Sequence, residues 1–242
     1  ENPGVISLAA GFVDFASLPV RETRESLAAV LADTKKGQQA LQYGTTQGSL
    51  RLRHRIHELC AKLEGKPAKD LGVGLDRIIM TTGSQQLLSL LCEVLFNPGD
   101  IALVSGPTYF VFLGALQGVG GQAIVIPSDD GGMRTDRLEE TLQQLEADRK
   151  LDRVKLIYLV SYYENPSGIS LATERRKEVV EVAKRWSKKQ RILILEDAAY
   201  RELRYDGPNW PSVWSFDPGG EHVVYTQTFS KSFSPGNRVG FG

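Results

Sequence analysis

The stretch KLIYLVSYYENPSGISLATERRKEVVEVAKRWSKKQRILILED, residues 155–197, contains two apolar runs separated by one amphipathic segment. The runs KLIYLVS and ILILED are rich in aliphatic residues and predict buried β-strands. The intervening TERRKEVVEVAKRWSKK carries its valines and a tryptophan on one face, which predicts a helix. Because a strand, a crossing helix and a second strand form a right-handed unit, the two strands are expected to run parallel. The stretch therefore predicts a parallel sheet covered by helices.

The same alternation extends along most of the chain. Five more short apolar runs, RIIMTT, IALVSG, AIVIPS, VVYTQT and RVGFG, bring the expected number of strands to seven. Helices are expected in RETRESLAAVLADTKK, SLRLRHRIHELCAKLEG, SQQLLSLLCEVLF and TYFVFLGALQGVG, and DRLEETLQQLEADRKLDR predicts a solvated helix. We expect an extended N-terminal segment over residues 1–25 and a three-layer α/β/α domain over residues 26–242, with a seven-stranded, mostly parallel sheet. Because the last strand stops at Gly242, we expect this domain to be truncated there.

Composition and charge narrow the functional classes. The 242 residues include 29 basic and 29 acidic side chains, without a basic block, so we expect neither nucleic acid nor a membrane surface as partner. The two cysteines have no metal or disulfide spacing, and the three histidines do not group with other ligands, so no metal site is expected. No apolar run is long enough to span a membrane, and no targeting segment is recognisable, so we expect a cytoplasmic protein that binds small molecules.

In an open α/β sheet, ligands bind at the carboxyl ends of the strands. Polar and aromatic residues that could carry chemistry follow five of the predicted strands. Each also has a purely structural interpretation, such as a helix N-cap, a core aromatic or a turn. The candidates are Gly83, Ser84 and Gln85 after the first strand, Tyr109 after the second, Asn165 after the fourth, Asp197 and Tyr200 after the fifth, and Thr228, Ser230, Lys231 and Arg238 after the sixth.

The chemistry of these residue types converges on one kind of ligand. An unprotonated lysine amine such as that of Lys231 can attack a carbonyl carbon and form a Schiff base. A helix start after a glycine turn, with hydroxyls and Arg238, can hold a phosphate. Asp197 follows four aliphatic residues, so its carboxylate should be buried and should need a cationic partner. Together the candidates require an aldehyde, a phosphate, a flat ring and a basic ring nitrogen.

The motifs occur in the order that class I/II aminotransferases have them, and the chain resembles this family of fold type I, pyridoxal-phosphate-dependent enzymes. The ordered set comprises the turn at Gly83, NPSG from Asn165, DAAY from Asp197 and the SK pair that ends at Lys231, followed by an arginine. The resemblance implies that Lys231 forms the Schiff base with pyridoxal 5′-phosphate and moves a proton between substrate and cofactor. It implies that Asp197 keeps the ring nitrogen protonated.

The resemblance also assigns roles to the other candidates. Asn165 and Tyr200 correspond to the residues that bond to the cofactor's 3′-oxygen, and Tyr109 to the ring stacked on the pyridine. Asn165 and Gly11 would lie beside the substrate, although Val13 stands where relatives usually have proline. Tyr43 is similar to the tyrosine that reaches the phosphate of the neighbouring subunit, which implies a homodimer. The phosphate cup would comprise Gly83, Ser84, Gln85, Thr228, Ser230 and Arg238.

Three functional interpretations stay open at this stage. In the first, the protein is an aminotransferase that moves an amino group between an amino acid and a 2-oxo acid. In the second, the same residues support a pyridoxal-phosphate-dependent C–S β-lyase. In the third, the chain is the effector-sensing, aminotransferase-like domain of a GntR-type transcription regulator. Relatives continue into a small C-terminal domain whose arginine binds the substrate carboxylate, and we expect that domain to be absent from this chain.

Overall fold

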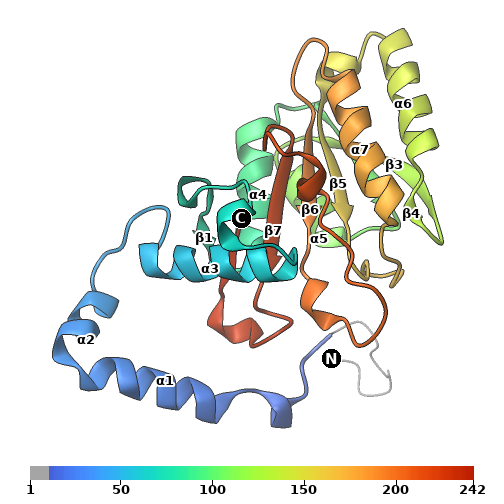
Figure 1. Ribbon diagram of the computed structural model, residues 1–242. Helices are drawn as coiled ribbons and strands as arrows, with labels where there is room; N and C mark the ends of the chain where they lie inside the picture. The colour runs from blue at the N-terminus through green and yellow to red at the C-terminus, as the bar shows by residue number, and fades with distance from the viewer. Residues whose placement is uncertain (1–10) are drawn as a thin grey trace, which may run out of the picture. The chain divides into compact units, whose positions relative to one another are not determined.

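The computed structural model describes residues 11–242 and divides the chain into two units, Glu1–Gly44 and Thr45–Gly242. In the first unit, a short 3-10 turn at Phe15–Ser17 precedes the helices α1 (Val20–Ala32) and α2 (Thr34–Leu41) (Figure 1). Asp33 lies between the two helices and caps α2, since its carboxylate accepts a hydrogen bond from the Lys36 N–H at 3.1 Å. Residues 1–10 of the expected extended segment lie outside the described residues. Residue 25, where we expect the boundary, lies within α1, and the division of the chain into an N-terminal segment and a large domain stays a prediction.

The second unit is the three-layer domain that the sequence predicts. Its helices are α3 (Leu50–Leu63), α4 (Ser84–Leu95), α5 (Phe110–Gly118), α6 (Thr135–Ala147) and α7 (Thr173–Trp186). Its strands are β1 (Met80–Thr81), β2 (Ile101–Gly106), β3 (Gln122–Asp129), β4 (Gly132–Met133), β5 (Val154–Val160), β6 (Leu193–Asp197), β7 (Val223–Thr228) and β8 (Gly240–Phe241). Every helix and strand that we expect after residue 44 has a counterpart here, and the α/β/α architecture is confirmed (Figure 1).

Within residues 11–242 the sheet has eight strands, in the order β1-β8-β7-β6-β5-β2-β3-β4. The central strands β7, β6, β5, β2 and β3 pair in parallel, whereas β1, β8 and β4 join antiparallel. The expected count of seven missed β4, because Gly132–Met133 is too short to produce an apolar run. The parallel centre places the carboxyl ends of β2, β5, β6 and β7 at one edge of the sheet.

Both faces of the sheet are buried, by different helices. On one face, leucines and valines of α6 and α7 pack against residues such as Leu103, Ile157 and Ile194. On the other face, α4 and α5 pack against residues such as Val104 and Leu195. Successive strand residues point to opposite faces, so strands buried on both sides are apolar throughout.

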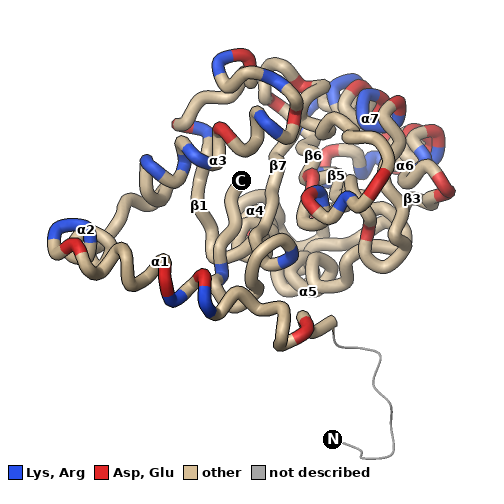
Figure 2. Tube along the Cα trace, turned by 60° about the horizontal axis from the view of Figure 1, so that its bottom comes forward, with Lys and Arg blue, Asp and Glu red and all other residues tan. Residues whose placement is uncertain are grey.

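The stretch at residues 136–153 was expected to form a solvated helix, and this expectation needs correction. Leu138, Leu142 and Leu145 of α6 are buried against the sheet and α7, so only the outer face of α6 is exposed to solvent. Figure 2 shows acidic and basic residues interspersed along α6 and α7. Some of them pair across the two helices, as Arg185 Nη2 of α7 does with Glu139 Oε2 of α6 at 2.6 Å.

Candidate active site at the carboxyl edge of the sheet

The strand ends bring most of the predicted residues to one edge of the sheet. Asp197 is the last residue of β6 and pairs in register with Val160 of β5 and Thr226 of β7. Thr228 ends β7, and Tyr109 directly precedes α5 after the end of β2. Because β7, β6, β5 and β2 are successive parallel strands of the sheet, the loops that follow them converge.

Asp197 is a buried carboxylate, with 3% of its surface exposed. Its Oδ2 accepts a hydrogen bond from the Tyr158 hydroxyl at 3.1 Å, and its Oδ1 accepts one from the Ala199 N–H at 3.1 Å. Burial raises the pKa of Asp197 to about 6, against the opposing effects of these two donors and of the Lys231 charge. No basic side chain among residues 11–242 forms an ion pair with Asp197. The expected cationic partner is therefore not supplied by the described part of the chain.

Asn165 and Tyr200 meet beside this carboxylate. Asn165 Nδ2 donates a hydrogen bond to the Tyr200 hydroxyl at 3.3 Å, although the two residues follow different strands. Burial raises the pKa of Tyr200, with the nearby Asp197 charge adding to the effect, so this hydroxyl stays protonated. The Lys231 ammonium lies 5.6 Å from the centre of the Tyr200 ring. The lysine, the amide and the phenol thus surround one space at the sheet edge.

Tyr109 lies between the end of β2 and the start of α5. It is half-buried, and burial raises its pKa, with further contributions from the neighbouring Tyr200 and Asp197.

The start of α4 forms the second half of the site. Gly83 precedes the helix with φ of 79°, a conformation that favours glycine, and the first N–H groups of α4 have no partner within the helix. Arg238 approaches this turn and donates a hydrogen bond to the Thr82 carbonyl at 3.1 Å. It does so from a left-handed backbone conformation with φ of 50°, which is rare for a residue with a side chain. Unpaired N–H groups beside a guanidinium make an anion site.

The remaining phosphate-cup candidates differ in which polar groups they leave free to bind an anion. Ser84 is the first residue of α4 and is buried, so its position fits the cup. The Gln85 side chain points along the helix, with Nε2 3.5 Å from Ser89 Oγ, so its backbone N–H is the group left for an anion. Thr228 and Ser230 bond to each other, with their hydroxyl oxygens 2.9 Å apart. This pair orders the loop that leads into Lys231.

Two predicted site residues belong to the first unit of the chain. Gly11 and Tyr43 belong to the unit Glu1–Gly44, which is described by itself. Gly11 has no atom within 4 Å of the position that a Cβ would take, and Tyr43 is 98% exposed. Their roles remain predictions.

The structure adds polar residues that the sequence did not single out. Tyr158 bonds to Asp197, as described above. Glu164 is buried next to Asn165 and accepts hydrogen bonds from Ser105 and Ser167, which ties the loop after β5 to strand β2. A glutamate within a loop motif gives no sequence signal of burial, and a tyrosine within an apolar strand looks like a core residue.

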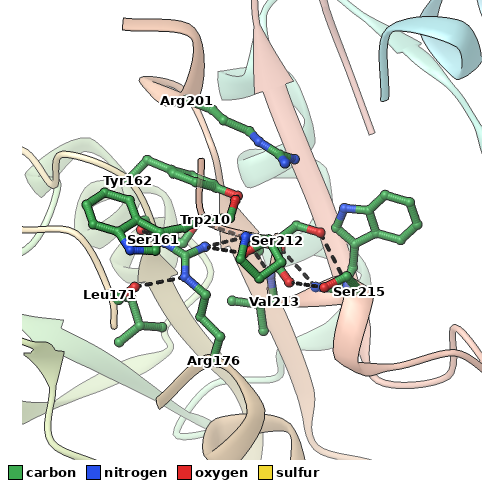
Figure 3. A network of polar contacts seen from close by, with 12 residues as sticks. Ser161, Tyr162, Leu171, Arg176, Arg201, Trp210, Ser212, Val213 and Ser215 are labelled. Atoms are coloured by element: carbon green, nitrogen blue, oxygen red, sulfur yellow. Dashed lines mark hydrogen bonds and ion pairs between the residues drawn. The ribbon is translucent and has the colours of Figure 1, made fainter. Parts of the chain in front are cut away.

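A buried network lies under the loop after β5 (Figure 3). The Arg176 guanidinium is fully buried and donates to the carbonyls of Ser161, Leu171 and Pro211. It also lies 3.7 Å from the Glu196 carboxylate, and its centre is 4.3 Å from that of the Tyr162 ring. The network fixes the start of the loop that carries Asn165.

The residues present fit pyridoxal phosphate. Asp197 offers a buried negative charge, which suits a protonated ring nitrogen. The start of α4 and Arg238 suit the phosphate, and Lys231 suits the aldehyde. Within residues 11–242, no three His, Cys, Asp or Glu side chains gather as metal ligands, and no helix has the length and apolar character needed to cross a membrane.

The sequence model of the aminotransferase class I and II family matches residues 3–242. The chain therefore belongs to this family, in agreement with its fold and with the site at the sheet edge. Pyridoxal phosphate is the cofactor of this site by that membership. The chain is 39% identical, over all of its length and 54% of the relative, to the aromatic-amino-acid aminotransferase 1 of Thermococcus litoralis. It also resembles the crystal structure of the Pyrococcus horikoshii kynurenine aminotransferase, with 36% identity and a TM-score of 0.86 over 98% of this chain and 55% of that one.

A different kind of relative matches a shorter part of the chain. An uncharacterized HTH-type transcriptional regulator, YjiR of Escherichia coli, is 35% identical over 170 residues, which are 70% of this chain and 34% of the regulator. The chain spans about half the length of the curated aminotransferases that it matches.

Proposed function

We propose that the protein is an aminotransferase that moves an amino group between an amino acid and a 2-oxo acid, with a cofactor Schiff base at Lys231 Nζ. The observation that carries this proposal is the buried Asp197 carboxylate, which has no cationic partner among residues 11–242, beside Lys231 and the Asn165–Tyr200 pair. When bound, pyridoxal phosphate supplies an electron-accepting ring beside the carbon that exchanges its amino group.

Each residue of the edge then has a task. Asp197 holds a proton on the ring nitrogen, because an ionised carboxylate in a dry site stabilises a neighbouring cation. Lys231 Nζ carries a proton between the substrate α-carbon and the cofactor. Asn165 and Tyr200 hold the ring oxygen, Tyr109 covers the ring, and the start of α4 with Arg238 anchors the phosphate.

We extend the proposal to the assembly and the compartment. Tyr43 is almost fully exposed within its own chain, which suits a residue that reaches the phosphate of a second subunit. Gly11 would border the substrate. Both cysteines are free and buried, as in proteins of a reducing compartment, which supports a cytoplasmic location, whereas the proposed homodimer rests on Tyr43.

The test uses the full-length protein with added pyridoxal phosphate. We would screen aromatic amino acids, kynurenine and 2-aminoadipate as amino donors, because the names of the relatives mention these compounds. Each donor is tested with several 2-oxo acids. We expect amino-group transfer that Lys231→Ala abolishes and Lys177→Ala, at an exposed position of α7, leaves unchanged. Borohydride treatment followed by peptide mapping should place the cofactor on Lys231. A label on another lysine would refute the assignment.

The relation to YjiR favours one alternative, namely a ligand-sensing domain of a transcription regulator. That alternative predicts cofactor binding at Lys231 without turnover of any amino acid. The C–S β-lyase alternative predicts release of pyruvate and ammonia from a cysteine conjugate. A cysteine conjugate added to the screen, with detection of pyruvate and ammonia, separates all three.

A further inference from the structure

The hydroxyl of Tyr158 forms the only side-chain hydrogen bond to Asp197 among the described residues. Tyr158 is fully buried in β5, and its ring stacks on Phe112 of α5, with 3.8 Å between ring centres and 18° between ring planes. This packing fixes the direction of the phenol, whose oxygen lies 3.1 Å from Asp197 Oδ2. The hydrogen bond is therefore part of a rigid core.

The direction of the hydrogen bond follows from the surroundings. Burial, together with the neighbouring Asp197 carboxylate, raises the pKa of Tyr158 well above its ordinary value, so the phenol keeps its proton and donates it. Asp197 Oδ1 is occupied by the Ala199 N–H. Each carboxylate oxygen thus receives one neutral donor from a fixed position, and the rotation of the carboxylate is set.

We propose that Tyr158 is a positioning residue of this site: its hydroxyl orients the Asp197 carboxylate and keeps it ionised toward the cofactor's ring nitrogen. This inference rests on the proposed function for its catalytic meaning. The contact itself lies wholly within the chain, so it can be tested whether or not the protein transfers amino groups.

Loss of this donor should make Asp197 more basic. A hydrogen bond to a charged group stabilises the charged form, and its removal should raise the carboxyl pKa by about one unit above its value of about 6. The other titratable groups near Asp197 stay in place, so the change isolates Tyr158. They are Glu196 on β6, Tyr200 after β6, Lys231 after β7 and Tyr109 before α5.

The experiment compares Tyr158→Phe with Tyr162→Phe in the full-length protein. Tyr162 is a matched control, because it is also buried and its hydroxyl donates to the Trp210 carbonyl, away from Asp197. Carbon-13 NMR of labelled aspartate follows the Asp197 titration in the cofactor-free protein, with Asp197→Asn to assign the signal. With cofactor bound, nitrogen-15 NMR of the labelled ring nitrogen reports where the proton lies.

We expect Tyr158→Phe to raise the Asp197 pKa and to move the ring-nitrogen signal toward neutral pyridine, whereas Tyr162→Phe changes neither. An Asp197 pKa that is equal in Tyr158→Phe and in the native protein would overturn the inference. If Tyr158→Phe does not fold, 3-fluorotyrosine at position 158 keeps the ring and strengthens the donor, so the Asp197 pKa should fall. An unchanged pKa there overturns the inference as well. Failure of the proposed function appears separately, as a native protein that transfers no amino group.

Discussion

Asp197→Asn should stabilise the cofactor-free protein above about pH 6. Burial raises the Asp197 pKa from 3.8 to about 6, so the folded state binds a proton more tightly than the unfolded state does. Native stability should therefore fall as the pH rises from about 4 to about 6. The full loss corresponds to about 3 kcal/mol, from 1.36 kcal/mol per pKa unit. Asparagine keeps an acceptor for the Ala199 N–H and does not titrate.

The assay is thermal unfolding of the full-length protein, with Asp152→Asn as an exposed control. Near pH 4 the Asp197→Asn variant should match the native protein, and near pH 8 its melting temperature should be several degrees higher. Added cofactor should reverse this order, because a ligand at about 1,000 times its Kd adds about 4.1 kcal/mol to a native protein that binds it much more tightly than the variant does. A variant that is no more stable than the native protein near pH 8 without cofactor would refute the argument.

Two further substitutions test the backbone and the buried network. A Cβ at residue 240 would lie 2.6 Å from the Gly83 carbonyl carbon, so Gly240→Ala should displace the start of α4. The variant should therefore bind the cofactor more weakly in a fluorescence titration. Gly114→Ala is the control and should bind normally, because no atom lies within 4 Å of the Cβ position there. Arg176→Met leaves the Glu196 carboxylate buried without its cation, so the free energy of unfolding should fall by about 3–5 kcal/mol in a chemical denaturation experiment. Adding Glu196→Gln to this variant should recover part of the loss. No recovery would contradict the pairing of Arg176 with Glu196.

The sequence predicts the architecture and the edge site because both depend on local patterns. Apolar runs that alternate with amphipathic segments specify parallel strands and covering helices, and parallel strands bring their carboxyl ends to one edge. Asp197, Asn165 and Lys231 follow such runs within a few residues, so their convergence follows from topology alone. The solvated α6 was predicted wrongly: Leu138, Leu142 and Leu145 have the i, i+4, i+7 spacing of an amphipathic helix, but the many charged residues around them favoured a solvated interpretation.

Contacts across the sheet could not be predicted in the same way. Tyr158 reaches Asp197 from the neighbouring strand, and its role depends on the register of β5 against β6, which no local pattern specifies. Glu164 and Ser105 are 59 residues apart and meet only after β2 and β5 have paired. Such pairs become visible when the strands are placed side by side.

The end of β6 carries two consecutive buried acids that the fold treats differently. Their side chains point to opposite faces of the sheet, as successive strand residues do. Glu196 receives donors from the Ser161 hydroxyl and from the Val213 and Trp214 N–H groups, and Arg176 supplies its counter-charge. Asp197 receives neutral donors alone. An unpaired carboxylate is costly to bury, because it loses its hydration. At Glu196, the positive charge of Arg176 offsets this cost. At Asp197, a cationic ligand that enters at the strand end would offset the same cost.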